Sequence, residues 1–140
     1  MTDTALVEKK LALIETCVQE LRSLARPASL AADVKEARFV QHTLQIALQG
    51  VLDVCSHVVS DERLGEPRTN RELIVLLERA GWISDPALAD ALGRMVAFRN
   101  VLVHNYDTVN LDIVRNIVEH HLDELLSFVQ AIRRRMAQVT

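Results

Sequence analysis

The sequence predicts an all-α protein: an antiparallel four-helix bundle with one additional short helix, formed by residues 1–140 as a single domain. A chain of 140 residues is long enough for one proper core and too short for two comfortable ones. Only 4 Gly and 3 Pro interrupt a sequence rich in Leu, Ala, Val, Glu and Arg. Apolar residues recur at helical spacing along most of the chain, and no useful stretch alternates as a strand would. Long helices joined by short loops pack as an antiparallel bundle.

The first predicted helix covers residues 3–25 and ends before Pro27. Ser29 is the predicted N-cap of a second, longer helix, and a loop containing Gly65 and Pro67 follows it over residues 60–68. The apolar stripe of the first helix is Val7, Leu11, Ile14, Val18, Leu21 and Ala25. That of the second is Leu30, Val34, Ala37, Leu44, Leu48, Val51, Cys55 and Val58.

A short helix and the helix after it are marked by their caps. Thr69 and Glu72 have the spacing of a capping box, and Gly81 is a natural residue to follow the C-terminus of the short helix. Asp85 and Pro86 then supply an N-cap and a first-turn proline for the next helix.

The last predicted helix follows a break over residues 105–110, a segment rich in Asn, Asp and Thr. We expect it to be a single helix that begins at Leu111 and ends in the cluster Arg133–Arg135. Its apolar stripe, like the others, also suits dimerisation, although periodicity does not separate self-association from packing within one chain. The stripe is Leu111, Val114, Val118, Leu122, Leu125, Val129 and Ile132.

The composition excludes several classes of protein. A net charge of −3 gives no overall reason to expect tight binding along a duplex, but it leaves room for a local basic pocket. Aromatic residues make up 4%, too few for a platform that stacks single-stranded nucleic acid. Cys17 and Cys55 occur singly within apolar helical patterns and without paired spacing, which predicts buried free thiols. With neither a membrane span nor a signal peptide in the pattern, we expect a cytoplasmic protein.

One stretch does not look like scaffold. Arg99, Asn100, His104 and Tyr106 lie within eight residues of a segment that is otherwise as apolar as a core helix. Burying such groups unpaired would cost about 1–3 kcal/mol each. A guanidinium binds phosphate oxygens in a forked geometry, and a histidine moves protons near neutral pH. The stretch therefore suggests chemistry on a phosphate.

The spacing alone leaves a structural interpretation open. On an unbroken helix, Arg99 and His104 point about 140° apart, whereas Asn100 and His104 share a face. We expect the helix to fray near His104, which would let the imidazole turn toward Arg99. The alternative is a surface arginine with a histidine and a tyrosine that cap the helix C-terminus.

Residues 99–106 resemble the Arg-x4-His-x-Tyr motif of the HEPN superfamily, in its HepT-like toxin branch. The flanks agree: Ala97 and Phe98 precede the motif, Leu102 and Val103 lie inside it, and a long amphipathic helix follows. The resemblance implies an HEPN-like bundle that acts as a metal-independent endoribonuclease, the toxin of a type II/VII-like toxin–antitoxin pair. It also implies a partner, a MntA-like minimal nucleotidyltransferase antitoxin.

Carried over by position, the resemblance makes Arg99 and His104 the catalytic pair and Asn100 a supporting polar contact with the substrate. Tyr106 resembles the tyrosine that the antitoxin modifies with AMP. No cofactor and no metal are implied. Because one histidine cannot conveniently act as both acid and base, we expect a homodimer with a composite active site for RNA.

Other patterns are weaker. His120 and Glu124 share a helix face, but no further ligand lies at metal spacing, so we interpret them as a solvated face. Arg133–Arg135 either ends a helix or also contacts RNA. The sequence has no nucleophile elbow, phosphate-binding glycine loop or zinc-finger spacing. Two other functions stay open: a non-catalytic helical partner that binds nucleotide or substrate for a nucleotidyltransferase, and a purely structural dimeric bundle.

Overall fold

The computed structural model describes residues 2–104 and 109–139, and all the regular secondary structure in these residues is helical. This confirms the all-α prediction. The elements are α1 (Thr4–Leu24), the 3₁₀ turn η1 (Pro27–Ser29), α2 (Val34–Asp61), α3 (Asn70–Arg79), α4 (Pro86–His104), α5 (Leu111–His120) and α6 (Leu122–Val139).

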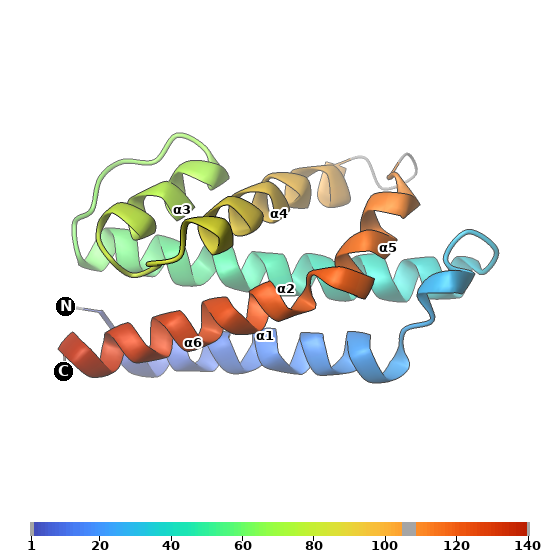
Figure 1. The fold of residues 1–140 in the computed structure, drawn as a ribbon, viewed down its shortest axis with the longest axis horizontal. Helices are drawn as coiled ribbons and strands as arrows, with labels where there is room; N and C mark the ends of the chain where they lie inside the picture. Colours follow the sequence, from blue (N-terminus) through green and yellow to red (C-terminus); the bar gives the residue numbers. More distant parts are fainter. Residues whose placement is uncertain (1, 105–108, 140) are drawn as a thin grey trace.

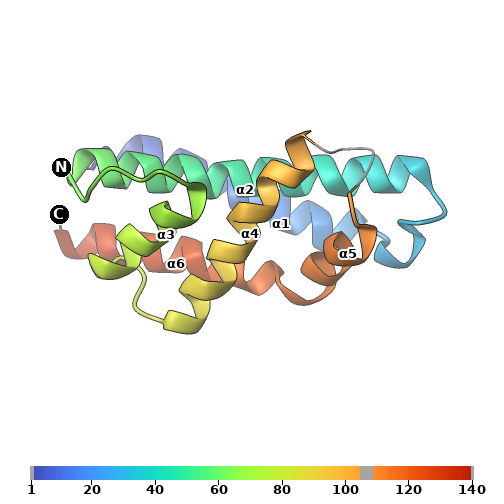
Figure 2. The same ribbon diagram turned by 90° about the horizontal axis from the view of Figure 1, so that it is seen from above.

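Four long helices run antiparallel to their neighbours along the chain (Figure 1). α1 packs against α2 and α6, and α4 crosses α2 at an angle that is clearest from above (Figure 2). The short α3 packs on α2 and α4 near the end where both termini lie, and α5 lies toward the other end, against η1 and α2. The predicted bundle with an extra short helix is therefore present, with α5 as a further short helix.

The first helix agrees with its predicted stripe, but the second begins later than predicted. Asp33, not Ser29, is its N-cap, because the Asp33 carboxylate accepts hydrogen bonds from the backbone N–H groups of Lys35 and Glu36 at 3.0 and 3.4 Å. Ser29 instead belongs to η1. Val34 is consequently 67% exposed and does not belong to the core.

The caps of α3 and α4 confirm the predictions. The Thr69 hydroxyl accepts from the Glu72 N–H at 3.2 Å, whereas the Glu72 carboxylate reaches the N–H of the residue before the cap. Gly81 follows the C-cap of α3 with φ of 84°, a conformation that glycine adopts without strain. The Asp85 carboxylate accepts from the Ala87 N–H at 2.9 Å and starts α4.

The prediction of one last helix is wrong. His121 still donates its N–H to the Ile117 carbonyl at 2.8 Å, but its φ and ψ of −126° and 9° are not helical and separate α5 from α6. The His121 ring lies 3.0 Å from the Glu124 carboxylate, and acidic residues in the first turn of α6 favour a helix start there. α6 then continues past Arg133–Arg135 to Val139, so this cluster does not end the helix.

The buried side chains form one hydrophobic cluster to which every α-helix contributes. α1 and α2 approach closely at Gly50, where an added Cβ would lie 2.8 Å from Cγ1 of Ile14. Cys17 and Cys55 are buried free thiols, and burial raises the pKa of both. No helix in the described part of the chain is both long and apolar enough to cross a membrane.

Candidate active site

The polar stretch lies on the last two turns of α4. Apolar residues anchor this helix in the core, with Met95, Val96 and Leu102 buried. The remaining positions carry the predicted site: Arg99 is half-buried, and Asn100 and His104 are exposed. The helix therefore holds the backbone of the site rigidly and presents its polar side chains toward the surface.

Two nitrogen atoms of the Arg99 guanidinium differ in their hydrogen bonding. Its Nη1 donates to the Asn100 Oδ1 at 3.3 Å. Its Nε is buried and has no hydrogen-bond partner among residues 2–104 and 109–139. Leaving a buried donor unpaired costs about 1–3 kcal/mol, so the fold gains nothing from this N–H. The arrangement suits an anionic ligand better than it suits stability.

His104 is the last residue of α4, and the helix is intact through it. The expected fraying near His104 stays a prediction, because α4 ends at this residue and residues 105–108 lie outside the described parts of the chain. The two side chains leave the helix about 140° apart, whereas Asn100 and His104 share a face. A single protomer thus does not direct Arg99 and His104 to one point.

Tyr106 lies outside the described residues. The role that the sequence predicts for it stays a prediction.

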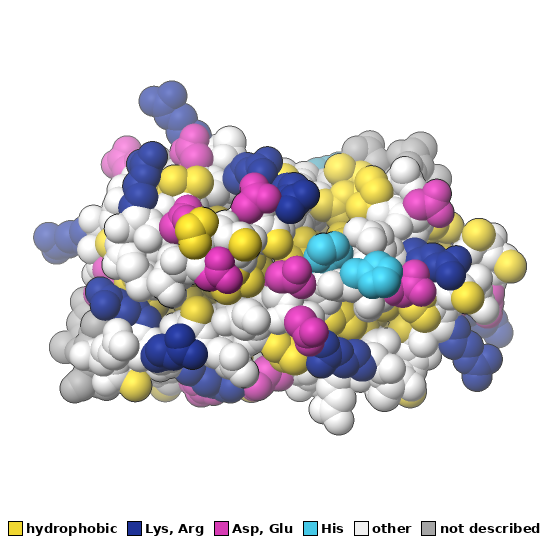
Figure 3. All heavy atoms as spheres, viewed as in Figure 1, with side chains coloured by type: hydrophobic (Ala, Val, Ile, Leu, Met, Phe, Trp, Pro, Cys, Tyr) yellow, Lys and Arg dark blue, Asp and Glu magenta, His cyan; other side chains and the backbone are white. Residues whose placement is uncertain are grey.

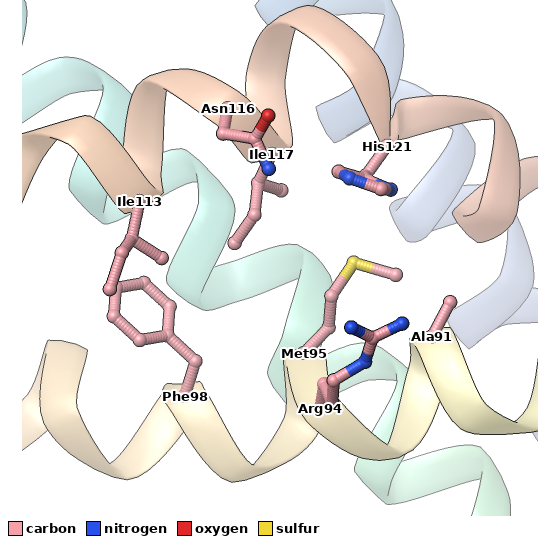
Figure 4. Close-up of a pocket in the computed structure, with 8 residues that line it drawn as sticks. All are labelled: Ala91, Arg94, Met95, Phe98, Ile113, Asn116, Ile117 and His121. Carbon is pink, nitrogen blue, oxygen red and sulfur yellow. The ribbon is translucent and has the colours of Figure 1, made fainter.

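A pocket that sequence reasoning missed lies beside Arg99, between α4 and α5. It has a volume of about 200 Å³ and ends on α4 at Phe98, the residue before Arg99. Figure 4 shows its lining, which is Ala91, Arg94, Met95, Phe98, Ile113, Asn116, Ile117 and His121. The only signal for it was the break after His120, which tilts α5 away from the direction of α6 (Figure 1).

Glu124, Arg133 and Arg135 have structural partners, and Glu124 pairs with His121 and not with the predicted neighbour His120. No group of three or more possible metal ligands occurs in the described parts of the chain. Arg133 donates to Glu8 and Glu15 on α1, and this hydrogen bonding lowers the pKa of Glu15 and raises that of Arg133. Arg135 lies over the Trp82 ring, 5.9 Å from its centroid. Two of the three arginines in the cluster thus serve the fold.

One face of the molecule has mixed charge. On the face shown in Figure 3, basic side chains alternate with acidic ones, and histidines lie near an exposed hydrophobic area. On α4, close to the pocket, Asp90 pairs with Arg94 at 2.9 Å and with Arg71 of α3 at 3.7 Å. No broad basic surface for duplex binding is evident on this face, in agreement with the net charge of −3.

Comparison with known proteins adds independent information. Residues 14–132 match the family described as Ribonuclease HepT-like. The mRNA nuclease HepT of Shewanella oneidensis is 31% identical over 129 residues, which cover 91% of this chain and 96% of that protein. The tRNA nuclease HepT of Aphanizomenon flos-aquae is 24% identical over 132 residues, 93% of this chain and 89% of that one.

A solved structure shares the fold as well. The tri-AMPylated HEPN toxin of Shewanella oneidensis, in complex with MNT antitoxin, superimposes with a TM-score of 0.83. It is 30% identical in sequence and covers 96% of this chain and 99% of its own.

Proposed function

Because this chain belongs to the HepT-like ribonuclease family, we propose that it is the RNA-cutting toxin of a toxin–antitoxin pair, with Arg99 and His104 as its catalytic residues. The observation that supports this role most directly is the Arg99 guanidinium, held by Asn100 and keeping a buried Nε donor without a partner in the described residues. The named relatives act on different RNAs, mRNA and tRNA, so the proposal extends to RNA as a class.

The chemistry requires no metal. The ribose 2′-oxygen attacks the neighbouring phosphorus and gives its proton to a general base. The bond from phosphorus to the 5′-oxygen of the next nucleotide breaks, and that oxygen takes a proton from a general acid. The products are a 2′,3′-cyclic phosphate and a free 5′-hydroxyl. His104 serves the proton transfers, worth about 10²–10⁴-fold in rate, and Arg99 stabilises the charge that develops on the phosphate oxygens.

Two protomers complete the site in this proposal. One imidazole cannot conveniently take one proton and give another in the same step, and α4 directs Arg99 and His104 of one protomer to different sides. A homodimer that brings two copies of α4 together across a twofold axis supplies two imidazoles and two guanidiniums to one cleft. Asn100, on the same face as His104, then contacts the RNA or orients Arg99.

Silencing acts through Tyr106 and a nucleotidyltransferase antitoxin. The solved relative is AMPylated and bound to its antitoxin, and Tyr106 is the tyrosine of the matching motif in this chain. An AMP group on Tyr106 adds a negative phosphate two residues beyond His104, where it competes with the substrate phosphate for Arg99.

The first test is cleavage of RNA by the purified, unmodified protein in the presence of a chelator. The wild type should cut and leave cyclic phosphate ends, and His104→Ala should lose activity while its molar mass in solution stays that of the wild type. His120→Ala is the matched control, since this exposed histidine lies on α5 outside the motif. Cleavage by His104→Ala at the wild-type rate would remove His104 from the mechanism.

Mixing experiments test the composite site. If each cleft needs both His104 side chains, then an equal mixture of wild type and His104→Ala, after subunit exchange, should keep about a quarter of the activity of undiluted wild type. Independent sites in each protomer would keep about half, and that result would contradict the twofold site.

Tyr106→Phe tests the silencing. This variant should cut RNA like the wild type and should neither incorporate AMP nor lose activity when the antitoxin and ATP are added. A variant that is silenced as well as the wild type would rule out Tyr106 as the modified residue.

A further inference from the structure

The pocket between α4 and α5 has an apolar floor and a polar rim. Met95, Phe98 and Ile117 form the floor together with Ile113, which is 44% exposed although it is a large hydrophobic residue. Figure 4 shows Phe98 and Ile113 facing each other at one end, and Arg94 and His121 together at the other. The remaining polar side chain is that of Asn116. Exposed apolar surface rimmed by polar groups is typical of binding sites.

Two of the three polar side chains at the rim are held by ion-pair partners, and the third is not. Asp90 holds Arg94 at 2.9 Å, and Glu124 holds the His121 ring at 3.0 Å. The Asn116 amide makes no hydrogen bond within residues 2–104 and 109–139. An amide with a free donor and a free acceptor can bind the edge of a nucleobase, which carries both kinds of group.

The pocket is placed next to the phosphate-binding residue. Phe98 directly precedes Arg99, and Met95 lies one turn before Arg99, about 6 Å along the helix axis. A phosphate held by Arg99 therefore has an adjoining nucleotide within reach of the pocket. With about 200 Å³, the cavity is smaller than pockets for drug-sized ligands, which have roughly 300–1,000 Å³, and suits one ring system.

We propose that this pocket binds one unstacked nucleobase of the RNA, beside the scissile phosphate, with Phe98 against the ring and Asn116 at its edge. The inference rests on the proposed ribonuclease function and adds a specificity site to it. An aromatic side chain combined with a polar group for the base edge is how proteins recognise single-stranded RNA. One such pocket reads one base, which agrees with the scarcity of aromatic residues.

The test compares Asn116→Ala with the control Gln130→Ala, which removes an exposed amide from α6, away from the pocket. The cut sites of a randomised RNA are mapped by sequencing its ends. Wild type and Gln130→Ala should share a base preference beside the cut. Asn116→Ala should lose it, and its kcat/KM on the preferred RNA should fall about tenfold, mostly through KM.

A second variant fills the cavity without removing a polar group. Ala91→Phe places a ring at the end of the pocket beside Arg94 (Figure 4), and because a pocket of about 200 Å³ has room for one ring system, this variant should weaken binding of a non-cleavable 2′-O-methyl RNA as Asn116→Ala does. Circular dichroism and thermal unfolding establish that both variants are folded.

The outcomes separate the two proposals. If the wild type does not cut but binds the 2′-O-methyl RNA with a base preference that Asn116→Ala abolishes, the pocket is supported and the nuclease is not. If the wild type cuts and Asn116→Ala matches Gln130→Ala in preference and kcat/KM, the pocket inference fails. It also fails if light scattering shows that both pocket variants change the oligomeric state with the base preference intact, since the pocket would then be a protomer contact.

Discussion

Replacing Arg99 by methionine should separate function from stability. Methionine keeps a long flexible stem but removes the guanidinium and its buried, unpaired Nε. An unpaired buried donor costs about 1–3 kcal/mol, and the lower end applies because the side chain is only half-buried. The lost hydrogen bond to Asn100 is long, at 3.3 Å, and is worth about 0.5 kcal/mol. The free energy of unfolding should therefore stay constant or rise by about 0.5 kcal/mol.

Cleavage should respond in the opposite way. Removing one donor to a developing oxyanion typically lowers kcat about 10²–10³-fold. The free energy of unfolding is measured in urea at one fixed protein concentration, because self-association would make the measured stability depend on that concentration. Arg68→Met is the control, since Arg68 is exposed and lies outside both the motif and the Arg133–Arg135 cluster, and it should change neither quantity. If Arg99→Met lowered the unfolding free energy by 1 kcal/mol or more, the guanidinium would be supporting the fold, and the argument from its unpaired donor would be refuted.

Two further predictions concern the scaffold. Arg133→Gln removes the pairs with Glu8 and Glu15 that join α6 to α1, and because these groups are partly exposed it should lower the unfolding free energy by only about 0.5–1 kcal/mol near pH 7. The Arg133 hydrogen bond lowers the pKa of Glu15 below its ordinary 4.5, so this contribution is present above that value and is lost as the pH falls through the lowered pKa. Urea unfolding from pH 7 to pH 3 should therefore show the two proteins converging, and a gap that widens toward pH 3 would contradict the assignment. Gly81→Ala should lower the unfolding free energy by about 1–2 kcal/mol, purely through its φ of 84°, because an added Cβ there meets nothing within 4 Å; an unchanged melting temperature would show that the turn relaxes.

Local chemistry made the ends of α3 and α4 predictable. Thr69 and Asp85 cap their helices by hydrogen bonds to backbone groups two or three residues away, so a few consecutive residues are enough to predict each cap. The same rule selected the wrong residue before α2, where Ser29 and Asp33 are both good caps. The structure selects Asp33, and the predicted core position at Val34 becomes exposed. Tertiary packing decides between such equivalent signals, and a single sequence does not contain it.

Periodicity failed at the last helix for a related reason. Val118, Leu122 and Leu125 keep helical spacing across the break at His121, and all three are buried. An apolar stripe predicts which side chains face the core. Two helices that meet at an angle around the core can have the same stripe as one straight helix. The acidic start of α6 was the available signal, and by itself it is common on exposed helix surfaces.

Part of the candidate site could be predicted from neighbouring residues in the sequence, and part depends on how distant segments pack together. The Arg-x4-His-x-Tyr motif is local and identifies Arg99 and His104 through resemblance, but it says nothing about how the two side chains meet. The structure makes α4 helical through His104, which leaves them on different sides of one helix. It also places α5 so that a pocket opens beside Phe98, which depends on the break at His121 and on no motif. The proposed reaction chemistry can thus be inferred from eight consecutive residues, whereas the proposed discrimination among RNA bases depends on α5, whose position only the folded chain defines.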